Sequence, residues 1–151
     1  MLNYQYTQAT VAIPMRSGAQ FTAKSYRVWT SKNPNEKNTK VVLIVRGDLE
    51  ERDAKWKEEW VFDWSDGEMN KLETAFHLID RHVEQRAARS EKRQEVFVDV
   101  NDWLRVGWID EKRAFRAYLR VTKNGKTMEA EFDNTPALFQ VRNALDQAAN
   151  S

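Results

Sequence analysis

The sequence predicts an α+β domain built from two antiparallel sheet-plus-helix halves, with the element order ββββα-ββββα. Strand-like segments with alternating apolar residues recur through residues 1–64 and again through 94–132. Each series ends in one amphipathic helical segment, Asp66–Ser90 in the first half and Pro136–Ala149 in the second. This order indicates a pseudo-twofold plan, with halves at about 8–90 and 94–149 in a single domain of residues 1–151. An unrepeated α+β domain is the alternative.

The first half contains four predicted strands separated by turn-forming segments. The strands are Thr10–Arg16, Phe21–Thr30, Lys40–Arg46 and Lys57–Trp64. Lys40–Arg46 is apolar on both faces, so we expect it to be central in its sheet. The connections are predicted to be a turn at Ser17-Gly18, a polar loop at Ser31–Asn38 and an acidic turn at Gly47–Ala54.

The first helix has a well-specified start. Ser65 as N-cap and Glu68 three residues later form a capping box, and Trp64 with Met69 fits a hydrophobic staple. An apolar stripe with helical spacing follows: Met69, Leu72, Phe76, Ile79 and Val83.

The second half repeats this order. Its predicted strands are Glu95–Val100, Trp103–Ile109, Arg113–Thr122 and Lys126–Phe132. Asn124-Gly125 predicts a tight hairpin, because both residues tolerate positive φ. Thr135 is the expected cap of the last helix, with Pro136 in its first position and a stripe of Leu138, Val141, Leu145 and Ala148. Phe132-Asp133-Asn134-Thr135 also resembles Phe62-Asp63-Trp64-Ser65 of the first half.

The amino-acid composition indicates the cellular compartment of the protein more clearly than it indicates the function. The chain has 24 Lys and Arg and 23 Asp and Glu, so its net charge is +1. This excludes a nucleic-acid-binding protein that relies on total positive charge, but it is compatible with a locally basic face. The chain has no Cys, which fits a reducing compartment. Apolar runs such as Val41–Val45 are too short to span a membrane, and the N-terminus lacks a signal-peptide pattern. We expect an intracellular, cytoplasmic protein of a bacterial or phage-infected cell, or an organelle protein.

No pattern indicates an enzyme, a cofactor or a metal. His77 and His82 lie five positions apart on the predicted helix and do not share a face, while Glu73 and His77 supply only two ligands. The acidic residues Asp48, Glu50, Glu51 and Asp53 read as a solvated loop. Nucleophile-elbow and phosphate-loop motifs are absent. We therefore expect a non-enzymatic protein without cofactors.

The predicted strand Arg113–Thr122 carries a candidate nucleic-acid site. Period-two geometry sets Arg116, Tyr118, Arg120 and Thr122 on one face, opposite the apolar Phe115, Ala117, Leu119 and Val121. Lys112 to Lys126 contains six basic residues, Lys123 among them, and no acid. Cations that meet phosphates, with a ring that stacks on a base, are what single-stranded nucleic acid requires.

The first half offers a second basic stretch. Residues 1–47 hold seven basic side chains and one acid, while acids concentrate around 48–68 and on helix faces. Lys24 and Tyr26 share one strand face, and Arg27 and Trp29 share the other. Two such stretches at related positions favour single-stranded DNA or RNA binding over solvated strand faces or protected sheet edges.

The alternative is a protein-interaction module, such as a phage-encoded or accessory adaptor or inhibitor. The chain has six Trp, most of which we expect in the core. Because Trp is enriched at protein interfaces, a Trp-rich and charged surface is a competing use, and self-association is expected.

The layout resembles the Whirly family of single-stranded nucleic-acid-binding proteins and its half-length relatives, the positive-cofactor-4-type coactivators. The stretch Trp60-Val-Phe-Asp-Trp-Ser65 is similar to the family's strand-to-helix passage, while the Lys-Gly-Lys-Ala-Ala-Leu motif of the plant members is absent. The resemblance implies radiating sheets, a homo-oligomer assembled through helices, and single-stranded nucleic acid across the strand faces. The residues we expect to bind it are Lys24, Tyr26, Arg27, Trp29, Arg116, Tyr118, Arg120 and Lys123.

Overall fold

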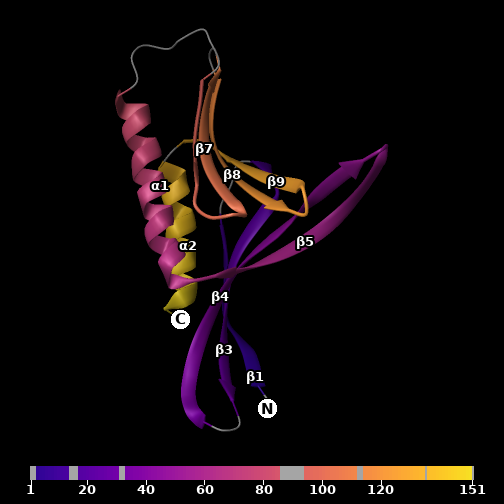
Figure 1. Cartoon of the computed structure of the whole chain (residues 1–151), viewed down its shortest axis with the longest axis vertical. Helices are drawn as coiled ribbons and strands as arrows, with labels where there is room; N and C mark the ends of the chain where they lie inside the picture. Colours follow the sequence, from indigo (N-terminus) through magenta and orange to yellow (C-terminus); the bar gives the residue numbers. More distant parts are fainter. Residues whose placement is uncertain are drawn as a thin grey trace.

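The computed structural model contains two antiparallel sheets and two helices (Figure 1). It describes the backbone of residues 3–13, 17–30, 33–85, 94–111, 114–134 and 136–150, and the side chains of 10–13, 17–26, 39–65, 67–84, 94–110, 116–134 and 136–150. The elements of the first half are β1 (Asn3–Ala12), β2 (Ser17–Gly18), β3 (Gln20–Thr30), β4 (Asn33–Glu51), β5 (Ala54–Trp64) and α1 (Asp66–Gln85). Those of the second half are β6 (Gln94–Asp99), β7 (Leu104–Glu111), β8 (Ala114–Lys123), β9 (Lys126–Phe132), the short 3₁₀ helix η1 (Pro136–Leu138) and α2 (Phe139–Ala149).

The two halves share one strand plan. The first sheet has the order β1-β3-β4-β5, and the second has the order β2-β9-β8-β7-β6. Apart from β2, each is an antiparallel meander of four consecutive strands that leads into a helix. The predicted α+β layout of two sheet-plus-helix halves is therefore confirmed.

Each helix packs against the sheet of the other half. α1 follows the first sheet but contacts β6 and β7, and α2 follows the second sheet but contacts β1, β3 and β4. The two helices also contact each other and lie side by side (Figure 1). One hydrophobic cluster joins Leu43 and Trp60 of the first sheet, Leu119 of the second, Phe76 of α1 and Leu145 of α2. Because the halves exchange their helices, they share a single core.

α1 begins at Asp66, as predicted, and Ser65 and Glu68 contact each other, but through bonds that differ from those of the predicted capping box. The Ser65 hydroxyl donates to a Glu68 carboxylate oxygen at 3.1 Å, and the Glu68 N–H donates to the Ser65 carbonyl at 3.0 Å. The predicted stripe faces inward, with Leu72, Phe76 and Ile79 buried and Met69 and Val83 half-buried against the core. The predicted end at Ser90 lies outside the described residues.

The predictions of a polar loop at Ser31–Asn38 and a turn over Gly47–Ala54 are wrong for most of their length. Asn33–Asn38 belongs to β4, and β4 continues to Glu51, so that only Arg52 and Asp53 turn, with φ of 49° and 66°. Cross-strand pairing of β4 at Asn33 and from Asn38 to Glu51 overrides the local preference of these polar residues. The resulting β4–β5 hairpin projects away from the helices (Figure 1).

Two further differences concern the N-terminal region. β1 covers Asn3–Ala12 rather than Thr10–Arg16, of which residues 14–16 lie outside the description. Ser17-Gly18, predicted as a turn, forms the short strand β2, which pairs with Glu131 and Ala130 of β9. Gly18 has a φ of 97°, a conformation that favours glycine, and this lets the chain pass from the second sheet into the first.

The second half agrees more closely with its predicted boundaries. Asn124 and Gly125 turn between β8 and β9 with φ of 53° and 77°. The residue predicted to cap the last helix, Thr135, lies outside the described residues. Asn134 accepts a hydrogen bond from the Ala137 N–H at 2.9 Å, and the chain enters η1 before α2. The predicted α2 stripe of Leu138, Val141, Leu145 and Ala148 is buried.

Candidate nucleic-acid interface

The outer face of the first sheet carries the first candidate residues. Along β3, Lys24 and Tyr26 are half-buried and alternate with the buried Ala23 and Ser25. Lys24 and Tyr26 therefore share the face that points away from the core, as predicted. The Lys24 ammonium lies 5.3 Å from the centre of the Tyr26 ring, within the range of a cation–π contact.

Lys40 joins these two residues from the neighbouring strand. In the register of β3 and β4, Tyr26 lies opposite Lys40 and Lys24 lies opposite Val42. We call Lys24, Tyr26 and Lys40 the Lys24 cluster. Lys40 forms an ion pair with Asp63 of β5 at 3.3 Å, but both side chains are more than half exposed, so the pair holds Lys40 weakly. Lys24 has no ion pair with any residue in the described part of the chain.

Lys40 was missed as a site residue although the sequence contained the signal. Lys40–Arg46 was predicted as a strand, and the period of two places Lys40, Val42, Ile44 and Arg46 on one face. Arg27 and Trp29 lie on β3, in register with Tyr6 and Tyr4 of β1, but their side chains are outside the description.

On the second sheet, Arg116, Tyr118 and Arg120 share one face of β8 as predicted, but the arginines are bound to carboxylates of their own sheet. Arg116 donates to Glu131 at 2.5 Å and Arg120 donates to Glu129 at 2.8 Å. Both acids lie on β9, the strand paired with β8. The expectation that acids concentrate elsewhere is thus wrong for this face.

Tyr118 is buried, so the prediction that its ring is free to stack on a base is wrong. None of its surface is exposed, and its ring covers Gly107, the residue opposite it on β7. A Cβ built on Gly107 would lie 2.1 Å from Cζ of Tyr118, which shows how closely the ring approaches that backbone. The Tyr118 hydroxyl donates to Glu95 at 3.1 Å, and burial, reinforced by Glu95, raises the pKa of Tyr118 to about 12. The signal in the sequence was the glycine in the middle of the neighbouring strand.

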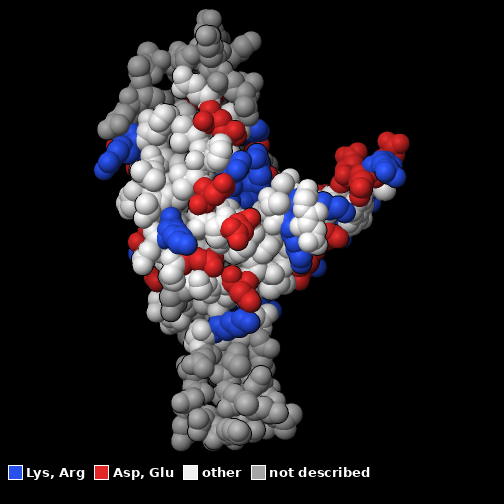
Figure 2. Space-filling model, in the orientation of Figure 1, with Lys and Arg blue, Asp and Glu red and all other residues white. Residues whose placement is uncertain are grey.

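The same pattern extends to β6 and β7. Arg105 donates to Asp99 at 2.7 Å, and its guanidinium lies 3.8 Å from the centre of the Phe97 ring. The hydrogen bond from Arg105 lowers the pKa of Asp99, and the same bond raises the pKa of Arg105. Arg120 also lies over Tyr118, 5.0 Å from its ring centre. Each of these arginines thus has a carboxylate partner, and Figure 2 shows acidic and basic side chains interspersed over the displayed face.

Lys123 is exposed but does not belong to the row of Arg116, Tyr118 and Arg120. It lies at the end of β8, in register with Lys126, on the side of the strand that carries Leu119 and Val121. It lines a small hollow of 300 Å³ together with Glu58 and Glu59. The structure therefore does not bring Lys123 together with the other candidates.

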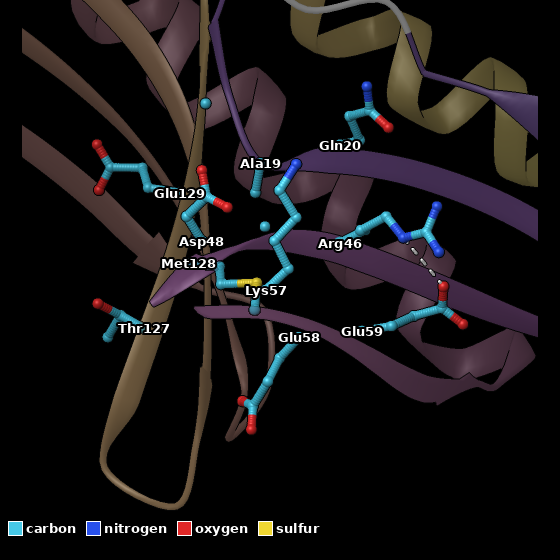
Figure 3. A pocket seen from close by; sticks show the side chains of 12 residues that line it. Ala19, Gln20, Arg46, Asp48, Lys57, Glu58, Glu59, Thr127, Met128 and Glu129 are labelled. Carbon is cyan, nitrogen blue, oxygen red and sulfur yellow. Dashed lines mark ion pairs between the residues drawn. The ribbon is translucent and has the colours of Figure 1, made fainter. Parts of the chain in front are cut away.

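A larger open groove of 810 Å³ lies where β3, β4 and β5 approach β9 (Figure 3). Its charged lining consists of the cations Arg46 and Lys57 and the acids Asp48, Glu58, Glu59 and Glu129. Arg46 lies 3.5 Å from Glu59, the ion pair drawn in Figure 3. With more acids than cations, this groove does not suit a polyanion.

The tryptophans with described side chains are mainly core residues, as predicted. Trp60, Trp64 and Trp108 are buried, and Trp56 and Trp103 are half-buried against the core. Trp103 stacks on Phe62 with ring centres 4.3 Å apart. These residues do not form the Trp-rich surface of the alternative interpretation.

Glu73 and His77 of α1, weighed above as metal ligands, both contact α2. Glu73 accepts a hydrogen bond from Arg142 of α2, and the His77 ring lies 5.7 Å from the Phe139 ring. Across the described side chains, no cluster of three or more His, Asp or Glu is arranged to hold a metal ion. No helix in the described part of the chain is long and apolar enough to cross a membrane.

Comparisons with protein-family models, with curated proteins and with solved structures found no match for this chain. The resemblance to the Whirly family stays a prediction based on layout.

Proposed function

We propose that this protein binds single-stranded nucleic acid, DNA or RNA, across the outer face of its first sheet, without catalysing a reaction. The observation that carries the proposal is the Lys24 cluster: a lysine without a carboxylate partner among the described residues lies over a tyrosine ring, with a second lysine opposite that ring. Phosphates would meet Lys24 and Lys40, and a base would stack on Tyr26.

The neighbouring residues of this face suit unpaired bases. One cross-strand row carries Ala12, Thr22, Ile44 and Val61, and Val61 is 51% exposed. The buried stripe of α2 packs into the common core on the inner side of this sheet. A flexible strand can lay its bases on such a surface, whereas the bases of a duplex are paired and stacked and cannot reach it.

The experiment is a fluorescence anisotropy titration of labelled oligo-dT and oligo-U at low salt and at increasing salt. Binding should weaken steeply with salt, and Lys24→Ala should reduce the salt slope by about one. Tyr26→Ala should weaken binding by about 1–3 kcal/mol if the ring stacks on a base, and Tyr26→Phe should retain affinity.

Arg116→Ala provides the matched control. Like Lys24→Ala, it removes a cation from the outer face of a sheet. Because Arg116 is already bound to Glu131, the affinity for the oligonucleotide should change far less than in Lys24→Ala. No oligonucleotide binding at low salt would overturn the proposed function, and an equal loss in both variants would reject the assignment to the first sheet.

The second candidate function is a protein-interaction module. Phe97 is 46% exposed and lies beneath the Arg105 guanidinium on the outer face of the second sheet. Aromatic residues and arginine are enriched at protein interfaces, and a charge-balanced surface suits a protein better than a polyanion. A partner captured from cells after nuclease treatment, and lost with Phe97→Asp, would support this function.

A further inference from the structure

β5 is an edge strand of the first sheet. The other outermost strands are β1, β2 and β6, of which β1 contacts α2 and β6 contacts α1. β5 pairs with β4 on one side, and no element of the described chain packs extensively along its other side. The strand runs for 11 residues, so its unpaired edge offers a long row of backbone donors and acceptors.

In the second half, the strand at the equivalent position pairs with a further strand. Phe62-Asp63 near the end of β5 resembles Phe132-Asp133, where β9 ends at Phe132, and this alignment sets Val61 against Glu131. In the second sheet, Glu131 pairs with Ser17 of β2. Among the described residues, no strand pairs with the corresponding edge of the first sheet.

We propose that a second copy of this chain pairs antiparallel with the free edge of β5, with the two-fold axis at Trp60, which joins the two first sheets into one continuous sheet. The occupant is a second copy because β5 is self-complementary in charge. This inference is independent of the proposed nucleic-acid binding.

The charges of β5 select the register. Residues opposite each other in an antiparallel pair must share a face. The registers that pair at least nine of the 11 residues of β5 set the axis at Glu58, Glu59 or Trp60. An axis at Glu58 or at Glu59 would place that glutamate opposite its own copy, and like charges directly opposite each other are destabilising. An axis at Trp60 has no such pair.

The Trp60 register also creates opposite-charge pairs. It sets Lys57 opposite Asp63 of the partner subunit, and by symmetry this pair forms twice. Lys57 has no ion pair with any described residue; Figure 3 shows its side chain extended across the open groove toward Ala19, so it would have to turn to the edge to meet the partner subunit. Asp63 is 76% exposed on the outer face, where it already forms the weak, exposed ion pair with Lys40 at 3.3 Å. Opposite-charge pairs also form in the competing registers, Lys57 with Glu59 for the axis at Glu58 and Lys55 with Asp63 for the axis at Glu59, so the like-charge pair at the axis is what disfavours them.

Substitution of Val61 by an acidic or a basic residue tests the proposed register. In the Trp60 register, Val61 lies opposite Glu59 of the partner subunit, and its exposed side chain tolerates substitution in the monomer. Val61→Glu should weaken dimerisation about tenfold because it creates two repulsive pairs, while Val61→Lys should preserve or strengthen it. A dimer in any register without Glu59 opposite residue 61 would not distinguish the two variants in this way.

The measurement is sedimentation equilibrium of the full chain without nucleic acid, with circular dichroism to verify the fold. Asp63→Lys should weaken the dimer about tenfold, and the double variant Lys57→Asp with Asp63→Lys should restore it. A chain that stays monomeric at high concentration overturns the proposal, and so does an equal effect of Val61→Glu and Val61→Lys. Because no oligonucleotide is present, failure here leaves the proposed function untouched.

Discussion

At Gly107 the absence of a side chain makes room for the ring of Tyr118. A Cβ added to Gly107 would lie 2.1 Å from Cζ and 2.3 Å from Oη of Tyr118, which is too close for any side chain. Gly107→Ala should therefore push the ring off β7 and lower the free energy of unfolding by about 1–3 kcal/mol, measured by urea denaturation. Gly67→Ala is the matched control. A Cβ there meets nothing within 4 Å in the first turn of α1, so stability should be unchanged or rise by up to about 1 kcal/mol.

The Tyr118 hydroxyl should make stability fall at high pH. Its pKa rises from 10.0 to about 12 on folding, chiefly because burial disfavours the charged form. The folded state therefore holds this proton more tightly than the unfolded state. Its contribution is fully present below pH 10 and is lost as pH rises towards about 12, by roughly 2 kcal/mol. Urea denaturation of wild type and Tyr118→Phe across this range tests the effect. Parallel pH curves for the two proteins would contradict it.

At the scale of elements, Asn101 joins the β6–β7 connection to the start of α1. Its side-chain oxygen accepts the N–H groups of Trp103 and Leu104 at 2.9 and 2.8 Å. Its amide group donates to Glu68 at 2.6 Å, and Glu68 in turn accepts from Ser65. This small network binds the first helix to a loop of the second half.

Asn101→Ala should lower the free energy of unfolding by about 1–3 kcal/mol, because it leaves two loop N–H groups and Glu68 without this partner. Asn143→Ala, at an exposed position of α2, should change stability by less than about 0.5 kcal/mol. Thermal and urea denaturation of both variants provide the comparison. Equal stabilities would show that water replaces the Asn101 hydrogen bonds without loss.

Elements were predictable from the sequence where local chemistry determines them, and arrangements between elements were not. The Ser65–Glu68 cap, the Asn124-Gly125 turn and the helix stripes depend on residues close in sequence. The packing of each helix against the sheet of the other half could not be predicted from the sequence, because an apolar stripe does not show which sheet the helix will contact. For the site, period two placed Lys24 with Tyr26 correctly. The period alone did not reveal that Glu129 and Glu131 lie beside Arg120 and Arg116; the register that places them there follows from the two-residue Asn124-Gly125 turn, and it was not used in the prediction.

At the scale of the whole molecule, the two sheets use their outer faces differently although they share one plan. The second sheet neutralises its arginines with acids from neighbouring strands, through Asp99, Glu129 and Glu131. The first sheet leaves Lys24 without such a partner among the described residues and keeps Lys40 in a weak, exposed pair. A near-neutral chain can therefore carry one face suited to a polyanion, because local potential rather than the total charge guides such a partner.

The exchange of helices predicts that both halves unfold together. Leu145 of α2 is fully buried, and α2 packs against β1, β3 and β4 of the first sheet. Leu145→Ala should cost about 2–5 kcal/mol through the cavity it creates. Because the core is shared, amide hydrogen exchange should speed up in β3 and β4 as much as in β8, although the substitution lies in the second half. Leu78→Ala, at a position on α1 that is 50% exposed, should leave both sheets protected. Faster exchange confined to β6–β9 would show that the halves unfold separately and would contradict a single core.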